Sequence, residues 1–352
     1  MTLLLVGSLI LLALLGLPLF IALAGGSLLA TFNAGLDPAL LAVELNRLAT
    51  SPHLAAIPLF TFAGVVLAAG GAPQRMIQLF NASVGWLPGG MAGVAIASCA
   101  FFTAFSGASG VTILALGGLM FPMLLHAGYK ERFTLGLLTT SGSLGLLFAP
   151  SLAILLYGIV AGVSIDKIFL AGIVPGLLLM LTLGLYALYI GRRADIPHHK
   201  FSLAILGRAV RDGFWDILLP LGILVGIFGG YVTITEASAC TAMYVLLLEG
   251  VIHREIHLAK HLPAILRDTA VLVGSILIIL SVAMGLTNLL IDAQIPMKIL
   301  DWMSVHVDSQ LQFLLLLNAF LLIVGCMMDI FSAIVVVVPL ILPIAESYGV
   351  HP

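Results

Sequence analysis

A cluster of small polar residues interrupts a very apolar stretch of the chain, and its residue types suit cation binding. The run Met91–Leu125 covers about 35 residues, too many for one transmembrane helix of about 20 and too few for two complete ones. Near its middle lie Ser106, Gly107, Ser109, Gly110 and Thr112. Glycines let two half-helices meet closely, and hydroxyls with freed backbone carbonyls are neutral oxygen ligands for a cation. We predict a cation site at a hairpin tip; tight packing of small residues is the alternative.

A second polar interruption lies in the next apolar segment, Phe133–Val160. A hydroxyl-rich stretch there is followed by glycine and proline, and proline removes a backbone donor and so frees a carbonyl group. We expect an unwound segment opposite the hairpin tip, with a simple proline kink as the alternative. Its candidate ligands are Thr140, Ser141, Gly142, Gly145, Pro150 and Ser151. Together, the two interruptions predict Na⁺ near Ser106, Ser109 and Gly142.

Two acidic residues stand at the ends or breaks of apolar segments. Asp329 is the only carboxylate in the long apolar run before Glu346, and a carboxylate inside a membrane is costly and usually functional. We interpret Asp329 as part of the ion or substrate site; capping of the following helix is the alternative. Glu236 follows Thr233 at the start of an apolar segment, so we interpret it as a structural cap.

The composition requires a membrane environment for these elements. Of 352 residues, 61% are hydrophobic and 9% charged, against roughly 25% charged in soluble domains. The net charge of −2 argues against nucleic acid as a partner. No nucleophile–base pair, phosphate-binding loop or plausible metal cluster is visible, so we expect neither an enzyme nor a cofactor beyond Na⁺ as coupling ion. We interpret His253, His257 and His261 as a solvated helix face.

Charge and repetition suggest how the segments are arranged. Basic residues between 192 and 211 and between 254 and 267 mark cytoplasmic loops under the positive-inside rule. The run Leu311–Ala345 is interrupted at Asp329 as the first run is at Ser106, and Pro122 and Pro343 align at an offset of 221 residues. The charge count places the two copies on opposite sides, as in inverted-repeat transporters. The second copy stops short at residue 352, so we expect that a further part of it is missing.

The predicted fold class is therefore an all-α polytopic membrane protein with an inverted repeat, two re-entrant hairpins and interfacial arm helices. The expected segments are as follows: a scaffold helix and first arm helix in 1–53; the first repeat, with the cytoplasmic-side hairpin and broken helix, in 54–190; a cytoplasmic loop in 191–213; scaffold helices and the second arm helix in 214–270; and an incomplete second repeat with the periplasmic-side hairpin in 271–352. The arm helices are Pro38–Ala49 and Ala259–Ala270.

Several motifs, in order along the chain, resemble one family. They are Phe105-Ser106-Gly107-Ala108-Ser109, Gly142-Ser143-Leu144-Gly145 with Pro150-Ser151, Pro175-Gly176, Gly229-Gly230 with Thr235-Glu236-Ala237, and Met328-Asp329 with Pro339 and Pro343. The chain is similar in this respect to the large membrane subunit of tripartite ATP-independent periplasmic (TRAP) transporters. The resemblance covers essentially the whole chain.

The resemblance implies an elevator-type, Na⁺-coupled importer in the bacterial inner membrane. It implies a small four-helix membrane subunit and a periplasmic solute-binding protein that delivers a carboxylate solute. Three alternatives stay open: an ion-coupled anion transporter of related hairpin architecture that needs no binding protein, an intramembrane enzyme, and a non-transporting scaffold subunit. Uptake measured with and without a binding protein separates the first of these from the TRAP interpretation.

Overall fold

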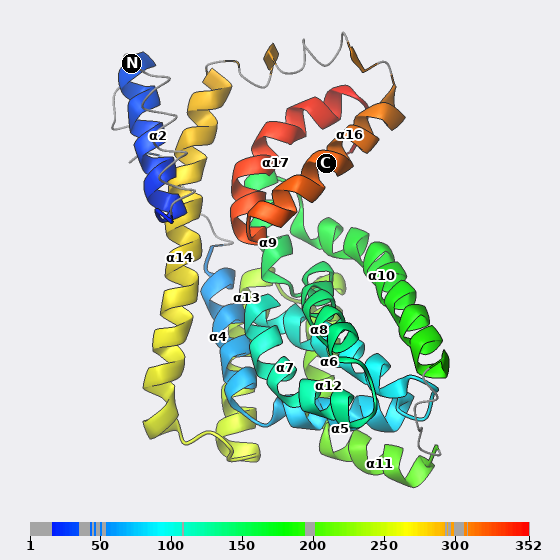
Figure 1. Ribbon diagram of the computed structural model, residues 1–352. Coiled ribbons are helices and arrows are strands. Elements are labelled where there is room, and N and C mark those ends of the chain that lie inside the picture. Colours follow the sequence, from blue (N-terminus) through cyan, green and yellow to red (C-terminus); the bar gives the residue numbers. More distant parts are fainter. Residues whose placement is uncertain are drawn as a thin grey trace. The chain divides into compact units, whose positions relative to one another are not determined.

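The computed structural model of the chain describes residues 16–34, 43, 46, 50, 54–107, 109–193, 201–292, 294, 297–298, 306–307 and 309–351. All regular secondary structure in these residues is helical, which confirms the all-α prediction (Figure 1). The helix α2 (Leu19–Ala34) continues the predicted first span. The predicted first arm helix, Pro38–Ala49, and the start of the first span fall outside the described residues.

Five described helices are long and apolar enough to cross a membrane, and up to seven spans result if each of two bent helix pairs counts as one. These five candidates are Ser109–His126, Ile165–Arg193, Ile234–Ile252, Ala259–Leu286 and Ile330–Ser347. The prediction of a multi-pass membrane protein is thus confirmed. On α10 (Ile165–Arg193) side chains such as Leu178 and Leu181 are exposed, as lipid-facing residues would be.

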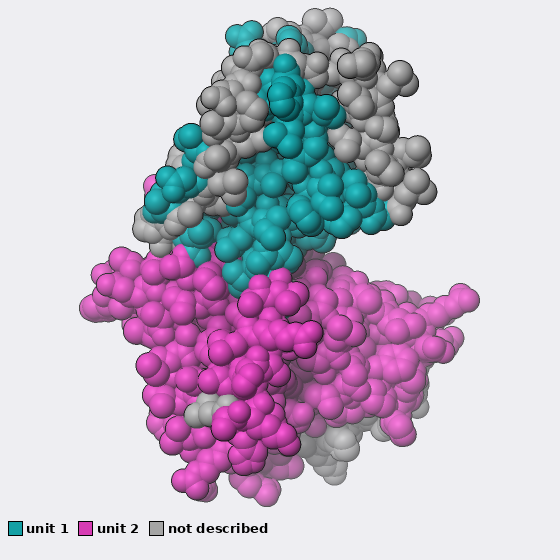
Figure 2. Space-filling model, turned by 90° about the vertical axis from the view of Figure 1, so that its left-hand side faces the viewer, with its two compact units in different colours: residues 1–54, 156–163, 272–352 teal, residues 55–155, 164–271 magenta. Residues whose placement is uncertain are grey.

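The chain divides into two compact units, coloured separately in Figure 2. Unit 2 comprises residues 55–155 and 164–271, and unit 1 comprises residues 1–54, 156–163 and 272–352. In unit 2, helix α6 (Gly90–Ser106) packs against α4 (Ala56–Ala69), α5 (Ala72–Val84), α7 (Ser109–His126) and α8 (Glu131–Leu144). Its side chains Phe102 and Cys99 are fully or almost fully buried, so α6 forms the centre of this unit.

Two helix breaks in unit 2 lie next to glycine or proline. Between α4 and α5 the axis bends by 75° at Gly70-Gly71. The helix α8 tightens into a 3₁₀ turn, η1 (Gly145–Leu147), and α9 (Leu152–Ala161) follows at an angle of 50°. The peptide bond between Ala149 and Pro150 is cis. The polar residues 139–143 therefore lie in the last turns of α8, and the chain leaves the α-helix just after them.

The remaining helices of unit 2 come from the second half of the chain. They are α11 (Leu203–Asp212), α12 (Phe214–Phe228), and α13 (Ile234–Leu247) with its π-helical end η2 (Leu248–Ile252). The helix α11 lies within the stretch expected to be a cytoplasmic loop, and it packs on α5. The helix α13 packs closely on α4.

The second predicted arm helix does not end where the sequence suggested. The helix α14 runs without interruption over Leu258–Asp292, so Ala259–Ala270 and the following span form one helix. A change from polar to apolar residues does not by itself break a helix, and the interfacial position expected for 259–270 stays a prediction. Breaking a helix requires a residue that disrupts the backbone hydrogen bonds.

The helix ends bear out the internal offset of 221 residues. Moving the bounds of α7 by this offset gives 330 and 347, which are the bounds of α17 (Ile330–Ser347). The end of α6 moves to 327, where α16 (Gln310–Met327) ends. Beyond the second helix of each pair, Gly128 and Gly349 both have positive φ, +98° and +72°. Their N–H groups donate to the carbonyls of Leu125 and Glu346, which lie at the same offset. The inverted orientation of the two copies stays a prediction.

Candidate functional site

The tip between α6 and α7 is closed by a glycine that no other residue replaces without strain. Gly107 has φ +65°, and its N–H donates to the carbonyl of Thr103 at 2.8 Å. A Cβ at this position would also lie closer than 3.0 Å to the Cβ of Leu152, at the start of α9. The tip therefore packs directly against the break that follows α8, as the sequence predicted for these two interruptions.

A cluster of hydroxyl groups lies beneath this tip. Thr103 and Ser106 of α6 and Thr112 of α7 meet the backbone carbonyl of Gly142 in α8; we call these four groups the hydroxyl cluster. The Oγ1 atom of Thr103 lies 2.8 Å from the Gly142 oxygen and 2.9 Å from Oγ1 of Thr112. The Ser106 Oγ atom lies 3.0 Å from the same Thr112 oxygen. All three hydroxyl side chains are buried.

The close oxygen–oxygen contacts in the cluster outnumber the hydroxyl hydrogens that could bridge them. Thr103 Oγ1 also lies 2.8 Å from the carbonyl of Cys99, so four oxygen–oxygen contacts share the three hydroxyl hydrogens of Thr103, Ser106 and Thr112. Below them, Oγ of Ser141 is buried without a hydrogen-bond partner among the described residues. A group of neutral oxygens short of hydrogens can accept a cation that supplies positive charge without a proton.

Glycines allow the helices around the cluster to approach each other. A Cβ on Gly145 would lie 2.6 Å from Cβ of Thr103 and 2.6 Å from the backbone nitrogen of Ala104. A Cβ on Gly64 of α4 would lie 2.6 Å from the carbonyl oxygen of Phe105 and from Cα of Ser106. The predicted residue Gly145 therefore acts through close backbone contact between the end of α8 and α6.

The predicted site residues divide into those that converge and those that do not. Ser106, Gly107, Thr112, Gly142 and Gly145 gather around the hydroxyl cluster, and Ser141 is buried next to Gly142 in the chain. Ser151 is buried at the start of α9, where its Oγ accepts the N–H of Ala153 at 3.2 Å. Ser109 is half-buried, and Gly110 and Thr140 are exposed. Thr103 was missed, although it lies one helical turn before Ser106, which is the signal that could have found it.

The two acids singled out in the sequence both cap helices. Asp329 in unit 1 accepts the N–H groups of Phe331 at 3.1 Å and Ser332 at 3.4 Å at the start of α17. Glu236 forms a capping box with Thr233 at the start of α13. Capping explains the position of both residues; the additional role predicted for Asp329 stays a prediction.

An ion-pair network in unit 2 was not anticipated from the sequence. Arg75 of α5 contacts Asp216 of α12, Glu249 of η2 and Glu255 of the following loop, and we call these residues the Arg75 cluster. Asp216 and Glu249 are almost wholly buried. Isolated acids at the ends of apolar segments are the sequence signal, but only the fold shows that they share one arginine.

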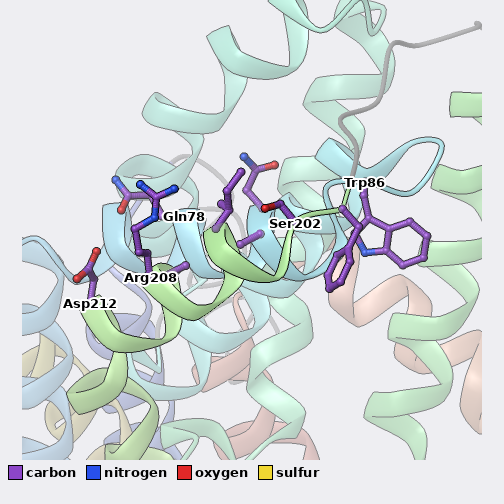
Figure 3. Close-up of a pocket in the computed structure, with 10 residues that line it drawn as sticks. Gln78, Trp86, Ser202, Arg208 and Asp212 are labelled. Carbon is purple, nitrogen blue, oxygen red and sulfur yellow. The ribbon is translucent and has the colours of Figure 1, made fainter.

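A cavity of about 540 Å³ lies between α5 and α11 (Figure 3). Gln78 and Trp86 line it from the region of α5, and Ser202, Arg208 and Asp212 from the region of α11. It shares no residue with the hydroxyl cluster and is not the predicted site. Across the described residues, no group of three or more His, Cys, Asp or Glu side chains is placed to hold a metal ion.

Several helices long and apolar enough to cross a membrane define a multi-pass membrane protein, and broken helices beside buried neutral oxygens are typical of transporters. A profile of the DctM component of tripartite ATP-independent periplasmic transporters matches residues 6–352. The chain therefore belongs to the DctM family of TRAP transporter permeases, which confirms the resemblance seen in the sequence. Relatives in this family are transporter subunits and not enzymes, in agreement with the sequence prediction.

Three relatives illustrate the range of the family. The C4-dicarboxylate TRAP transporter large permease protein DctM of Pseudomonas aeruginosa is 34% identical over 313 residues, which cover 89% of this chain and 73% of the relative. The ectoine TRAP transporter large permease protein TeaC of Halomonas elongata is 31% identical over 356 residues, covering 100% and 83%. The isethionate TRAP transporter permease protein DctMQ of Oleidesulfovibrio alaskensis is 32% identical over 341 residues. These cover 96% of this chain and 53% of the relative, so the chain spans about half of that protein.

Proposed function

We propose that this chain is the large membrane subunit of a Na⁺-coupled TRAP transporter that imports a carboxylate-type organic solute across a bacterial inner membrane. The observation that carries the coupling ion is the hydroxyl cluster. Its oxygens come from three helices, and they lie beside a helix break, where backbone carbonyls are freed from helical bonding. Neutral oxygens suit a monovalent cation that must be released again in each transport cycle.

The proposed site uses the residues that converge in unit 2. Thr103, Ser106 and Thr112 would supply hydroxyl oxygens, and Gly142 would supply its carbonyl oxygen. The buried Oγ of Ser141 offers a further oxygen. Asp329, at the start of α17, stays a further candidate for the ion or substrate site. Alternation between the two sides of the membrane would follow an elevator movement of the hairpin-bearing part.

The partners and the solute class are proposed from the relatives. Names such as C4-dicarboxylate and 2,3-diketo-L-gulonate transporter support a carboxylate solute. The family description, a tripartite periplasmic transporter, supports two partners, which we take to be a periplasmic binding protein and a small membrane subunit. The chain would therefore work in a complex of three different proteins.

The experiment replaces Thr103 by valine, which keeps the shape of the side chain and removes its oxygen. The matched control is Thr61→Val, because Thr61 is equally buried but its hydroxyl donates only to Ile57 of its own helix. Loss of one neutral ligand weakens Na⁺ binding by about 1.4 kcal/mol. We therefore expect the Na⁺ concentration for half-maximal uptake to rise roughly tenfold in Thr103→Val alone. Uptake is measured in proteoliposomes that contain the assembled transporter and the binding protein.

Two results would contradict the proposal. Equal Na⁺ dependence in Thr103→Val and Thr61→Val would remove the hydroxyl cluster as the coupling site. Uptake that proceeds equally well without the binding protein would favour the alternative transporter that takes solute directly from the periplasm.

A further inference from the structure

The Arg75 cluster joins three separate parts of unit 2 around a single guanidinium group. Arg75 donates from Nε to Asp216 at 2.7 Å and from Nη2 to its other oxygen at 3.0 Å. Its Nη1 donates to Glu255 at 2.9 Å, and its Nη2 also donates to Oε1 of Glu249. The cluster therefore links α5, α12 and the end of α13, at the bend between α4 and α5.

The charges of this cluster do not balance if every acid is ionised. One arginine faces three carboxyl groups, and two of these are almost wholly buried: Asp216 is 1% exposed and Glu249 is 0% exposed. The nearby His253 adds no positive charge, because burial and then the charge of Arg75 lower its pKa. The hydroxyl of Tyr244, on α13, donates elsewhere, to the carbonyl of Trp215, and not to an acid of the cluster. An excess negative charge in a buried site is strongly unfavourable.

The three acids differ in how well they are neutralised. Asp216 uses both oxygens on Arg75, which is the strongest geometry for an ionised pair. Partial burial raises the pKa of Glu255, but the charge and hydrogen bond of Arg75 outweigh this effect and hold the pKa below its usual range. Glu249 uses only Oε1; its Oε2 atom is buried and has no hydrogen-bond partner among the described residues.

The backbone of the α4–α5 bend lies directly against Oε2 of Glu249. A Cβ on Gly70 would lie closer than 3.0 Å to Oε2 of Glu249, and one on Gly71 would lie equally close to the carboxylate of Glu255. The backbone of the α4–α5 bend thus covers the free oxygen directly. The chain after Glu249 folds back, since the N–H groups of Glu255 and Ile256 both donate to the Glu249 carbonyl.

We propose that Glu249 binds a proton on Oε2, and that the neutral carboxyl group fastens the α4–α5 bend to the end of α13. The proton makes the net negative charge of the cluster smaller by one. It also converts the buried Oε2 from an unpaired acceptor into a donor facing the Glu255 carboxylate. Loss of the proton places an uncompensated charge against Gly70. An unfolded glutamate releases its proton at about pH 4.3, whereas the folded chain would keep the proton of Glu249 to higher pH. The free energy of unfolding therefore falls as the pH rises above the unfolded value.

The test measures the carboxyl C=O stretch of the purified full chain by infrared spectroscopy as the pH is raised. We expect a protonated carboxyl band at neutral pH that is lost in Glu249→Gln and kept in Glu346→Gln, a control at an exposed glutamate. Thermal unfolding of the same proteins follows. The melting temperature of the wild type should fall as the pH rises from about 5 through neutral, whereas that of Glu249→Gln should lack this fall.

Each other outcome overturns the proposal. A wild type without the band, or a band that persists in Glu249→Gln, shows that Glu249 is ionised. Failure of Glu249→Gln to fold would also show that Glu249 is ionised, because glutamine keeps the shape and the neutral donor of a protonated glutamate. If added Na⁺ restores the melting temperature that is lost as the pH rises, Oε2 of Glu249 binds a cation and not a proton.

Discussion

The contact between Gly145 and α6 gives the sharpest test of how the hydroxyl cluster is built. Gly145 has an ordinary helical backbone, with φ −64°, so Gly145→Ala introduces no backbone strain. Its new Cβ would lie 2.6 Å from Cβ of Thr103 and from the nitrogen of Ala104, where ordinary contact begins at 3.4 Å. The end of α8 must therefore move away from α6 by about 1 Å.

The cost of this movement has two parts. Overpacking of a dense interior costs about 1–3 kcal/mol. The same movement lengthens the 2.8 Å contact between Thr103 and Gly142, and a lost hydrogen bond costs about 1 kcal/mol more. We therefore expect Gly145→Ala to destabilise the chain by about 2–4 kcal/mol and to weaken stabilisation by Na⁺.

Gly136→Ala is the matched control, because Gly136 lies in the same helix and a Cβ there meets nothing within 4 Å. Alanine should raise stability there by about 0.5–1 kcal/mol through its higher helix propensity. Thermal unfolding in detergent, with and without Na⁺, compares the two variants. Equal melting temperatures for Gly145→Ala and Gly136→Ala would show that α8 does not pack on α6 as described.

Two further predictions concern the hairpin tips. Gly107→Ala should lower the melting temperature more than Gly128→Ala. Both positions have positive φ, worth roughly 1–2 kcal/mol, but only Gly107 also meets a neighbour, Leu152. Equal effects would contradict the close tip contact. Asp329→Ala should cost about 0.5–2 kcal/mol through the lost cap, whereas Asp329→Asn keeps the cap. Normal uptake with an unaltered Na⁺ response in Asp329→Asn would leave Asp329 as a cap alone.

Local features of the fold could be predicted from the sequence because each has a local cause. The apolar segments mark the helices, and Gly107 and Pro150 mark the breaks between them. The offset of 221 residues predicts the start and end of α17 from those of α7, since the same turn residues recur. The sequence marks the change from polar to apolar residues within α14, but not where this one helix would enter the membrane, because no breaking residue marks that point.

Features that depend on packing between distant segments could not be predicted from the sequence. The oxygen of Thr103 belongs to the site only because α8 brings the Gly142 carbonyl to it, across 39 residues of chain. The Arg75 cluster spans even longer separations: its arginine lies 141 residues from Asp216 and 174 residues from Glu249. Nothing in the neighbourhood of Arg75 along the chain shows three acids converging on it.

The helix α4 connects the two sites that we propose. Its Gly64 lies against Ser106 in the hydroxyl cluster, and Gly70, directly after its last residue, lies against Oε2 of Glu249. Six residues separate them, about 9 Å along the helix axis. A buried helix cannot shift at one end without straining the contact at the other, so a proton on Glu249 and a cation at the cluster would act on one rigid element. Linkage then requires each to change the affinity of the other by the same factor.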